Sequence, residues 1–498
     1  MGHYFYEMIP SSEKEQLNYI PTVPEFLTWI EKKYADRPAL SDTQITYTYS
    51  EMCDRIARRR TIIADLGLKK GSKIAVFERN SIDAVESFLA IISSGMVAIM
   101  LPASLPEPAV AGCCRRFDVE AVLVRGEFMP ICGQLGGMGI KVIASSDLAD
   151  RPTPAASVDK EDTAAIFFTG GTTGAPKGAV LPHRALMRGS YNGCFMPGSV
   201  LCGHRYIGML PLSHVFGLIR STMSVLYTGG LWYSCEDMKA VIGKIPVIKP
   251  TCLVLVPGIC DILCGLTKLY GPQFLGGELK TIISGAANVP PRLISEFDKL
   301  GISLLGGYGM TEGANLTTGN ADVRTHPTSV GKVYPEQECK VVDGELWIKG
   351  DNVFTGYYKD EANTNAALTQ DGWLRSGDLA RIDEDGFIYI VGRIKNLIIL
   401  SNGENVSPEA IEEPFYANPC VKDALVSEGE IDGHKCIAIE ILPQPQAFAG
   451  KTDQEIYEYM QNLVDSVNKT MPSTHRISKM TVRKEDFKRT GSMKVARI

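Results

Sequence analysis

The hydrophobic pattern in the first third of the chain alternates between two periods. In residues 48–66 (TYSEMCDRIARRRTIIADL), apolar side chains recur at the spacing of an amphipathic helix, and Gly67 follows as a stop signal. Three short runs rich in Val and Ile come next, SKIAVFE, VAIML and AVLVRG, separated by segments with a helical pattern. Continuous apolar runs of this length are typical of strands buried in a parallel sheet. The alternation therefore predicts an α/β fold with a largely parallel sheet.

One apolar stretch, FLAIISSGMVAIMLPA from Phe88, approaches the length of a membrane span. Ser93, Ser94 and Gly95 interrupt it in the middle. We therefore expect a buried helix that ends near Ser94 and then the buried strand GMVAIML, with no integral membrane segment.

Two further blocks follow. PTCLVLVPGICDILCGL and LKTIISGAA repeat the strand–helix alternation, which predicts a second α/β block. From about Ser329 the pattern changes to short alternating strands, such as KVVDGELWIKG, VFTGYYKD and LARIDEDGFIYIVGR. The DEDG turn between two such strands is a hairpin signal, so this part is predicted to be mainly β.

A smaller unit is predicted beyond Arg393. A helix on PEAIEEPFY, strands on ALVSEG and KCIAIEIL, and a helix from Asp453 through Asn468 are sufficient for a small α+β domain. No Pro- or Ser-rich spacer marks a linker near residue 395.

Composition narrows the class of protein. The 498 residues are 45% hydrophobic and 22% charged, as in an ordinary globular protein long enough for more than one domain. The net charge of -6 gives no electrostatic footprint for nucleic acid. The 13 cysteines include no CxxC pair and the 7 histidines no ligand cluster, so reduced thiols are expected rather than disulfides or zinc. The first residues, MGHYFYEMIPSSEKEQ, lack the features of a signal peptide, and we expect a cytoplasmic protein.

A candidate phosphate site lies in IFFTGGTTGAPKG, residues 166–178. It is not a P-loop, because Lys177 is followed by Gly178 and not by the Ser or Thr that would reach magnesium. Glycines let backbone amides converge on an anion without Cβ clashes, and Lys177 adds a cation. The alternative is a glycine-rich hairpin without a ligand.

Four more motifs follow in a fixed order. They are YGMTE (308–312), GWLRSGD (372–378), GRIKN (392–396) and KRTGSMKVAR (488–497). With the loop, this ordered set resembles the acyl-adenylate-forming superfamily of acyl- and aryl-CoA synthetases, peptide-synthetase adenylation domains and luciferases. The resemblance extends from about Thr48 to Arg497. It implies a large N-terminal domain, residues 1–394, of two mainly parallel α/β sheets with a small β-barrel-like subdomain, and a mobile C-terminal lid, residues 395–498.

The resemblance also implies which residues contact ATP, Mg²⁺ and CoA. Thr311 matches the donor to the α-phosphate and Glu312 the carboxylate ligand of Mg²⁺. Lys494 matches the lysine that bridges the substrate carboxylate and the α-phosphate, although Met493 stands where the family usually has Gly. The other positions implied to bind nucleotide or CoA are Thr169, Gly170, Gly171, Thr172, Thr173, Gly174 and Lys177 (β- and γ-phosphates), Gly285, Ala286, Ala287 and Tyr308 (adenine), Asp378 and Arg393 (ribose), and Gly403 (pantetheine channel).

The motif LPLSHVFG, residues 210–217, resembles its counterpart in CoA ligases. Relatives that activate amino acids carry an Asp nearby for the substrate ammonium, and this chain has none at that position. His214 is implied to border the acyl pocket and the thiol path, with a satisfied core histidine as the alternative. Phe216, Gly217, Gly307 and Met310 are implied to line an apolar acyl pocket, and Lys395 matches the hinge of the lid.

The resulting hypothesis is an ATP-dependent carboxylate–CoA ligase for a fatty or aryl acid, which forms acyl-AMP and pyrophosphate and then a thioester. Three alternatives stay open: an enzyme that loads a carrier-protein thiol, a luciferase-like oxygenase, and a catalytically impaired nucleotide- or acyl-binding protein. The identity of the acid and the existence of a homo-oligomer are not decided by the sequence.

Overall fold

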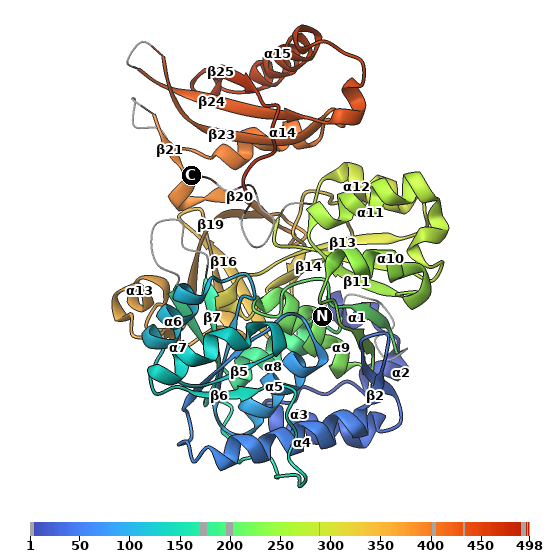
Figure 1. Ribbon diagram of the computed structural model, residues 1–498. Helices are drawn as coiled ribbons and strands as arrows, with labels where there is room; N and C mark the ends of the chain where they lie inside the picture. Colours follow the sequence, from blue (N-terminus) through green and yellow to red (C-terminus); the bar gives the residue numbers. More distant parts are fainter. Residues whose placement is uncertain are drawn as a thin grey trace.

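The computed structural model describes residues 4–169, 177–195, 203–287, 289–400, 405–431, 434–489, 495 and 497. Figure 1 shows a large N-terminal body and a smaller C-terminal domain, which lies against the body next to β19 and β20. The predicted α/β class is confirmed, since mixed sheets covered by helices make up the large domain.

The first sheet forms the scaffold for the candidate phosphate loop. Its inner strands pair in parallel, while β8 runs antiparallel to both β7 and β18. The predicted runs SKIAVFE, VAIML and AVLVRG form three of these strands. In spatial order the strands are β18 (Gly356–Tyr357), β8 (Lys177–Pro182), β7 (Thr163–Thr169), β4 (Val97–Leu101), β3 (Lys73–Phe77), β5 (Val119–Val124) and β6 (Lys141–Ala144).

Two more sheets build the rest of the large domain's core. In one, β11, β12 and β13 are parallel and β14 and β15 continue antiparallel; in the other, β1, β10 and β9 are parallel and β2 pairs antiparallel to β1. The strands are β11 (Cys252–Leu255), β12 (Thr281–Ser284), β13 (Ser303–Tyr308), β14 (Thr318–Asn320) and β15 (Lys332–Val333), and β2 (Thr46–Thr48), β1 (Pro38–Ser41), β10 (Leu231–Tyr233) and β9 (Arg205–Ile207).

The helices cover these sheets and follow local signals in the sequence. Helix α4 (Tyr49–Asp65) begins at Thr48, whose hydroxyl and the Glu51 carboxylate form a capping box. Helix α5 (Ile82–Ser93) ends where predicted and leads into β4. The other helices of this domain are α1 (Tyr4–Met8), α2 (Ser11–Lys14), α3 (Val23–Tyr34), α6 (Glu107–Arg116), α7 (Cys132–Gly137), α8 (His183–Asn192), the π-helix Phe216–Met223, α9 (Ser224–Tyr227), α10 (Met238–Ile248), α11 (Pro257–Tyr270), α12 (Pro291–Asp298) and α13 (Glu361–Ala367).

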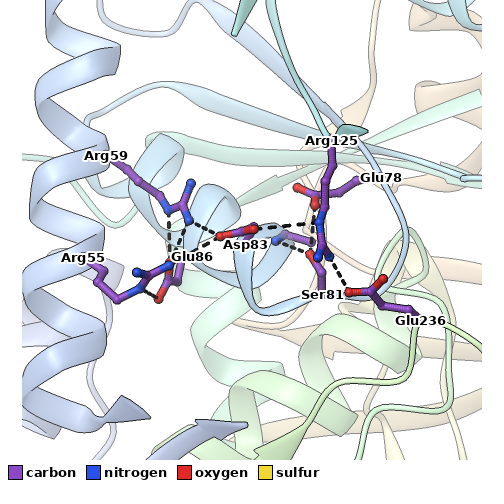
Figure 2. A network of polar contacts seen from close by, with 9 residues as sticks. Arg55, Arg59, Glu78, Ser81, Asp83, Glu86, Arg125 and Glu236 are labelled. Atoms are coloured by element: carbon purple, nitrogen blue, oxygen red, sulfur yellow. Dashed lines mark hydrogen bonds and ion pairs between the residues drawn. The ribbon is translucent and has the colours of Figure 1, made fainter. Parts of the chain in front are cut away.

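A buried ion network joins α4 to α5 (Figure 2). The Glu86 carboxylate, which is fully buried, accepts hydrogen bonds from Arg55 at 2.6 Å and from Arg59 at 2.9 Å. Asp83 also contacts Arg59, so the two guanidinium groups share two carboxylates. Charges removed from water need such partners, and this pairing fixes the packing of the two helices.

The predicted β part is an antiparallel sheet in the order β16-β17-β19-β20. Its hairpin turn lies at Asp383–Gly386, where Gly386 has φ +83° and Asp383 accepts the Phe387 N–H at 2.8 Å. VFTGYYKD behaves differently from the prediction, because only Gly356–Tyr357 is a strand and it joins the first sheet. The strands of the antiparallel sheet are β16 (Gln337–Val342), β17 (Glu345–Gly350), β19 (Leu374–Ile382) and β20 (Ile388–Arg393).

The C-terminal domain has a hydrophobic core of its own, formed by side chains between Ile398 and Ile477. Helices α14 and α15 pack on the sheet β23-β24-β25, and a short pair, β21 with β22, precedes them. The elements are β21 (Ile398–Ile399), β22 (Asn405–Val406), α14 (Pro408–Tyr416), β23 (Val421–Ile431), β24 (His434–Pro443), α15 (Asp453–Thr470) and β25 (Ile477–Val482). Across the described part of the chain, no helix combines the length and the apolar character that a membrane crossing requires.

Candidate functional site

Three strands bring together a tyrosine, an aspartate and an arginine. Tyr308 ends β13, and Asp378 of β19 lies opposite Arg393 of β20 in the antiparallel register. The Tyr308 hydroxyl donates to Asp378 Oδ2 at 2.6 Å, and the Arg393 guanidinium donates to both carboxylate oxygens. The Asp378 side chain is only 5% exposed, so these contacts replace its hydration.

Burial and charge in this cluster act on the pKa values of Tyr308 and Arg393. Burial and then the Asp378 carboxylate hold the pKa of Tyr308 well above its usual value, so the phenol keeps its proton and donates it. Burial alone would lower the pKa of Arg393, but Asp378, Tyr308 and Glu312 together raise it. The two oxygens of a carboxylate offer about four lone-pair positions in all, so Asp378 can accept hydrogen bonds from further donors.

A tight turn after Tyr308 positions the next two predicted residues. A Cβ added at Gly309 would lie 1.2 Å from the Asn315 carbonyl oxygen, so only glycine fits there. The Asn315 N–H donates to the Met310 carbonyl at 2.9 Å and closes the loop. As a result, Thr311 and Glu312 are buried directly beside the Tyr308 cluster.

Glu312 is held by a residue that the sequence did not indicate. The Tyr357 hydroxyl of β18 donates to Glu312 Oε1 at 2.7 Å. The Lys177 ammonium lies 4.9 Å from the centre of the Tyr357 ring and also donates to Asn363 Oδ1. Lys177 and Glu312 are therefore joined through one aromatic side chain. The local pattern of VFTGYYKD predicts only strands, and neither it nor the residues that follow indicate Tyr357 or Asn363 as site residues.

Lys395 is influenced by charges from both the Asp378–Arg393 cluster and Glu312. Burial lowers its pKa and the Arg393 charge acts in the same direction, while Asp378 and Glu312 oppose the shift. The ammonium of the predicted hinge thus lies within the electrostatic field of the site. The adjacent Asn396 donates to Glu409 Oε1 at 2.6 Å and ties this segment to α14.

The candidate phosphate loop is closed at its base by Thr169 and Lys177. These two residues pair across the antiparallel strands β7 and β8. Gly170, Gly171, Thr172, Thr173 and Gly174 lie outside the described residues, as do Lys494, Met493 and Gly403. Near the tail, Val495 pairs with Arg489, and Arg497 donates to Glu412 Oε2 at 2.6 Å.

The predicted adenine and acyl residues meet at the edge of the second sheet. The Phe216 ring lies 3.2 Å from the position of a Cβ added at Gly285, and the Gly307 carbonyl lies 3.7 Å from it. Ala286 adopts a left-handed backbone with φ +66°, which turns the chain directly after Gly285, with Ala287 following. Gly285, Phe216 and Gly307 therefore lie side by side and form one wall of the candidate site.

His214 and Gly217 shape the start of the π-helix. His214 Nδ1 accepts the Phe216 N–H at 3.2 Å, and His214 is only partly buried. A Cβ at Gly217 would lie 2.1 Å from the Pro211 carbonyl, so the close approach of the preceding loop requires glycine. Met310 is partly buried and its sulfur lies 3.9 Å from the Tyr308 hydroxyl.

Two cavities lie elsewhere on the large domain. One, of about 430 Å³, is lined by residues such as Lys70, Asp162 and Tyr358, and the other, of about 410 Å³, by Leu27 and Arg60 among others. Neither is lined by a residue predicted for the site. Within the described ranges no group of three or more His, Cys, Asp or Glu side chains forms a metal-binding cluster. The buried Glu312 carboxylate suits a magnesium ion that takes its other ligands from phosphates and water.

Two protein-family models match the chain. The model described as AMP-binding enzyme matches residues 27–358, and the model described as AMP-binding enzyme C-terminal domain matches residues 395–498. The chain therefore belongs to the AMP-binding enzyme family, and its homologues include acyl- and aryl-CoA ligases.

The relatives carry names from that class of ligase. 4-Coumarate–CoA ligase-like 6 of Arabidopsis thaliana is 30% identical over 410 residues, which cover 73% of this chain and 70% of the relative. Fatty acyl-CoA synthetase A of Dictyostelium discoideum is 27% identical over 472 residues, which cover 76% and 69%.

Solved structures share the fold over nearly the whole chain. The anthranilate CoA ligase AuaEII in complex with anthranoyl-AMP superposes with a TM-score of 0.85 at 20% identity, covering 97% of this chain and 96% of that one. The O-succinylbenzoate coenzyme A synthetase of Bacillus subtilis in complex with ATP and magnesium ion gives a TM-score of 0.78 at 23% identity, covering 94% and 98%.

Proposed function

We propose that the protein is an ATP- and Mg²⁺-dependent carboxylate–CoA ligase. A substrate carboxylate oxygen attacks the α-phosphorus of ATP and pyrophosphate leaves; the CoA sulfur then attacks the acyl carbonyl of the adenylate and AMP leaves. The observation that carries the proposal is the cluster of Tyr308, Asp378 and Arg393 beside the Glu312–Tyr357 pair. The reaction brings together two anions, the substrate carboxylate and ATP. Its main requirement is therefore a set of fixed hydrogen-bond donors and cations around the charge that develops at the α-phosphate.

The nucleotide fits the first cluster. We assign the ribose hydroxyls to the Asp378 carboxylate, because it is nearly buried and its oxygens can accept further hydrogen bonds. Arg393 keeps that carboxylate oriented from the opposite strand. Tyr308 and the segment Gly285–Ala287 are assigned to the adenine, where the absence of side chains at Gly285 and Gly307 leaves room for a flat ring.

The phosphates are assigned to the second group of residues. Lys177 and the loop from Thr169 to Gly174 would hold the β- and γ-phosphates, and Thr311 would donate to the α-phosphate. Glu312 would hold Mg²⁺, which when bound neutralises phosphate charge. Tyr357 supports this assignment, since it fixes the Glu312 carboxylate by a direct hydrogen bond.

The acid and the thiol are assigned to the remaining residues. Phe216, Gly217, Gly307 and Met310 would contact the acyl group, with His214 beside the path of the thiol. Lys494 would stabilise the adenylation transition state, Lys395 would act as the hinge, and Gly403 would face the pantetheine. The names of the relatives include both aryl and fatty acids, so they leave the acid undecided.

A pyrophosphate-exchange assay tests the proposal. ATP, Mg²⁺ and a panel of aliphatic and aromatic acids are supplied with and without CoA, and both exchange and thioester are measured. Exchange with at least one acid, and thioester when CoA is present, is expected. Exchange without any CoA thioester would favour a carrier-protein thiol as the acceptor. No exchange with any acid would refute the ligase proposal.

A further inference from the structure

Arg220 is a buried cation without a counter-ion. It lies in the π-helix Phe216–Met223 and is 1% exposed. Among the residues that the structure describes, none forms an ion pair with Arg220. Its guanidinium interacts with the neutral Tyr206 side chain, but none of its three nitrogens has a hydrogen-bond partner of normal geometry. Arginine keeps its charge in proteins, so the charge at this position is unbalanced.

The neighbours of Arg220 are neutral. Its charge acts on Cys194, Tyr206 and Tyr334, and burial raises the pKa of each of these groups, so none becomes an anion at ordinary pH. At the positions outside the description, the only acidic side chains in the sequence are Glu404 and Asp432, and both belong to the C-terminal part of the chain. The large domain therefore offers Arg220 no carboxylate.

Arg59 shows how the same chain treats a buried arginine that serves the fold. It is equally buried, at 1% exposure, but donates to Glu86 and Asp83 (Figure 2). A buried charge without such a partner is strongly unfavourable, and an unpaired polar group of this kind calls for a missing ligand or another explanation. An anion that is not part of the large domain would balance the charge of Arg220.

The position of Arg220 indicates which anion that is. It follows Phe216 by four residues, close to one turn of a helix with i→i+5 hydrogen bonds, so both side chains project from nearly the same face. The Phe216 ring is the group that lies against Gly285. Asn192 and Ser221, on α8 and the same π-helix, are also fully buried and leave side-chain polar atoms without partners. Arg220 and Ser221 on the π-helix and Asn192 on α8 thus all have side-chain polar atoms without a hydrogen-bond partner.

We propose that Arg220 binds a second anionic group of the acid substrate, so that the preferred substrates are dicarboxylic acids. This inference rests on the ligase function proposed above and specifies the class of its substrate. One carboxylate is adenylated near Thr311, and the other forms a charge-assisted, bidentate pair with the Arg220 guanidinium. An uncharged acyl chain would leave the guanidinium buried and unpaired, which selects against fatty acids.

Matched acids test the proposal in the intact protein. Pyrophosphate exchange is measured with hexanedioate, its monomethyl ester and hexanoate, and with benzene-1,4-dicarboxylate and benzoate. We expect kcat/KM for a diacid to exceed that for its uncharged match by at least tenfold. In Arg220→Met, which keeps the length of the side chain, diacid activity should fall on the order of 10²–10³-fold, while monoacid activity stays or rises. Arg220→Lys should keep part of the diacid preference.

Arg60→Met is the matched control. Arg60 is also buried, but it donates to the Thr153 carbonyl at 2.8 Å and to Ser93 Oγ at 3.3 Å. Arg60→Met should lower Tm without changing acid preference, whereas Arg220→Met should raise Tm of the ligand-free protein because it removes an unpaired charge.

The outcomes separate the two proposals. Equal or better exchange with monoacids in the wild type, or a diacid preference that Arg220→Met retains, would overturn the inference and leave the ligase function standing. The wild-type comparison decides the matter even if a variant does not fold. Failure of every acid to support exchange would instead overturn the proposed function itself.

Discussion

Tyr357→Phe isolates the contact by which β18 fixes Glu312. The substitution removes one hydroxyl and keeps the aromatic ring beside the Lys177 ammonium. In the structure this hydroxyl donates to Glu312 Oε1 at 2.7 Å, and Glu312 is only 7% exposed. Because water has little access, no solvent molecule readily replaces the lost donor. The carboxylate should therefore lose its fixed orientation, which is the property that a Mg²⁺ ligand needs.

The size of the effect follows from the type of hydrogen bond. A hydrogen bond to a charged acceptor contributes about 1.5–3 kcal/mol. Removing a partner that orients a metal-binding group typically costs about 10–100-fold in metal affinity or activity. We therefore expect the Mg²⁺ concentration for half-maximal pyrophosphate exchange to rise about 10–100-fold. The apparent KM for the acid should change little, because Tyr357 is not among the residues assigned to the acyl group.

The neighbouring residue provides a matched control. The Tyr358 hydroxyl donates to Asp118 Oδ2 at 2.5 Å, outside the candidate site. Tyr358→Phe makes the same chemical change one position along the chain and should leave the Mg²⁺ dependence unaltered. If the two variants shift the Mg²⁺ titration equally, or if Tyr357→Phe leaves it unchanged, the assignment of Glu312 to the metal is wrong.

Three further changes test other parts of the proposal. Lys494→Ala should slow adenylate formation on the order of 10²–10³-fold and spare thioester formation from supplied acyl-AMP; equal losses in the two half-reactions would contradict the role of Lys494. Lys395→Pro restricts φ at the hinge and should spare pyrophosphate exchange while blocking CoA transfer, so intact transfer in a coupled thioester assay would disprove the hinge. Burial raises the pKa of Glu78 to about 7 from an ordinary 4.5, so the folded state holds a proton that the unfolded chain has lost, and stability falls as pH rises from about 4.5 to 7. Glu78→Gln should remove a penalty of roughly 3 kcal/mol and raise Tm at pH 8.5 but not at pH 4.5; a pH-independent change would show that Glu78 does not titrate in this way.

Local patterns predicted those helices and strands whose signals are contained in a few neighbouring residues. The capping box at Thr48 and the interruption at Ser93–Gly95 each needed no information from elsewhere in the chain. The pairing of Asp378 with Arg393 is also close in sequence, since one hairpin joins β19 and β20. Tyr308 reaches the same cluster from another sheet, and only the ordered motifs of a family indicated that the three act together.

Tyr357 and Tyr358 show why part of the site could not be predicted. Alternation along a strand predicts that adjacent side chains point to opposite faces, and they do: one hydroxyl meets Glu312 and the other meets Asp118. Which face belongs to the site depends on the antiparallel pairing of β18 with β8, two strands about 175 residues apart in the chain. A shift of that pairing by one residue would exchange the two tyrosines and leave Glu312 without its donor. Arg220 could not be predicted for a similar reason. Its charge is visible in the sequence, but that no carboxylate pairs with it among the residues the structure describes is known only from its neighbours in space.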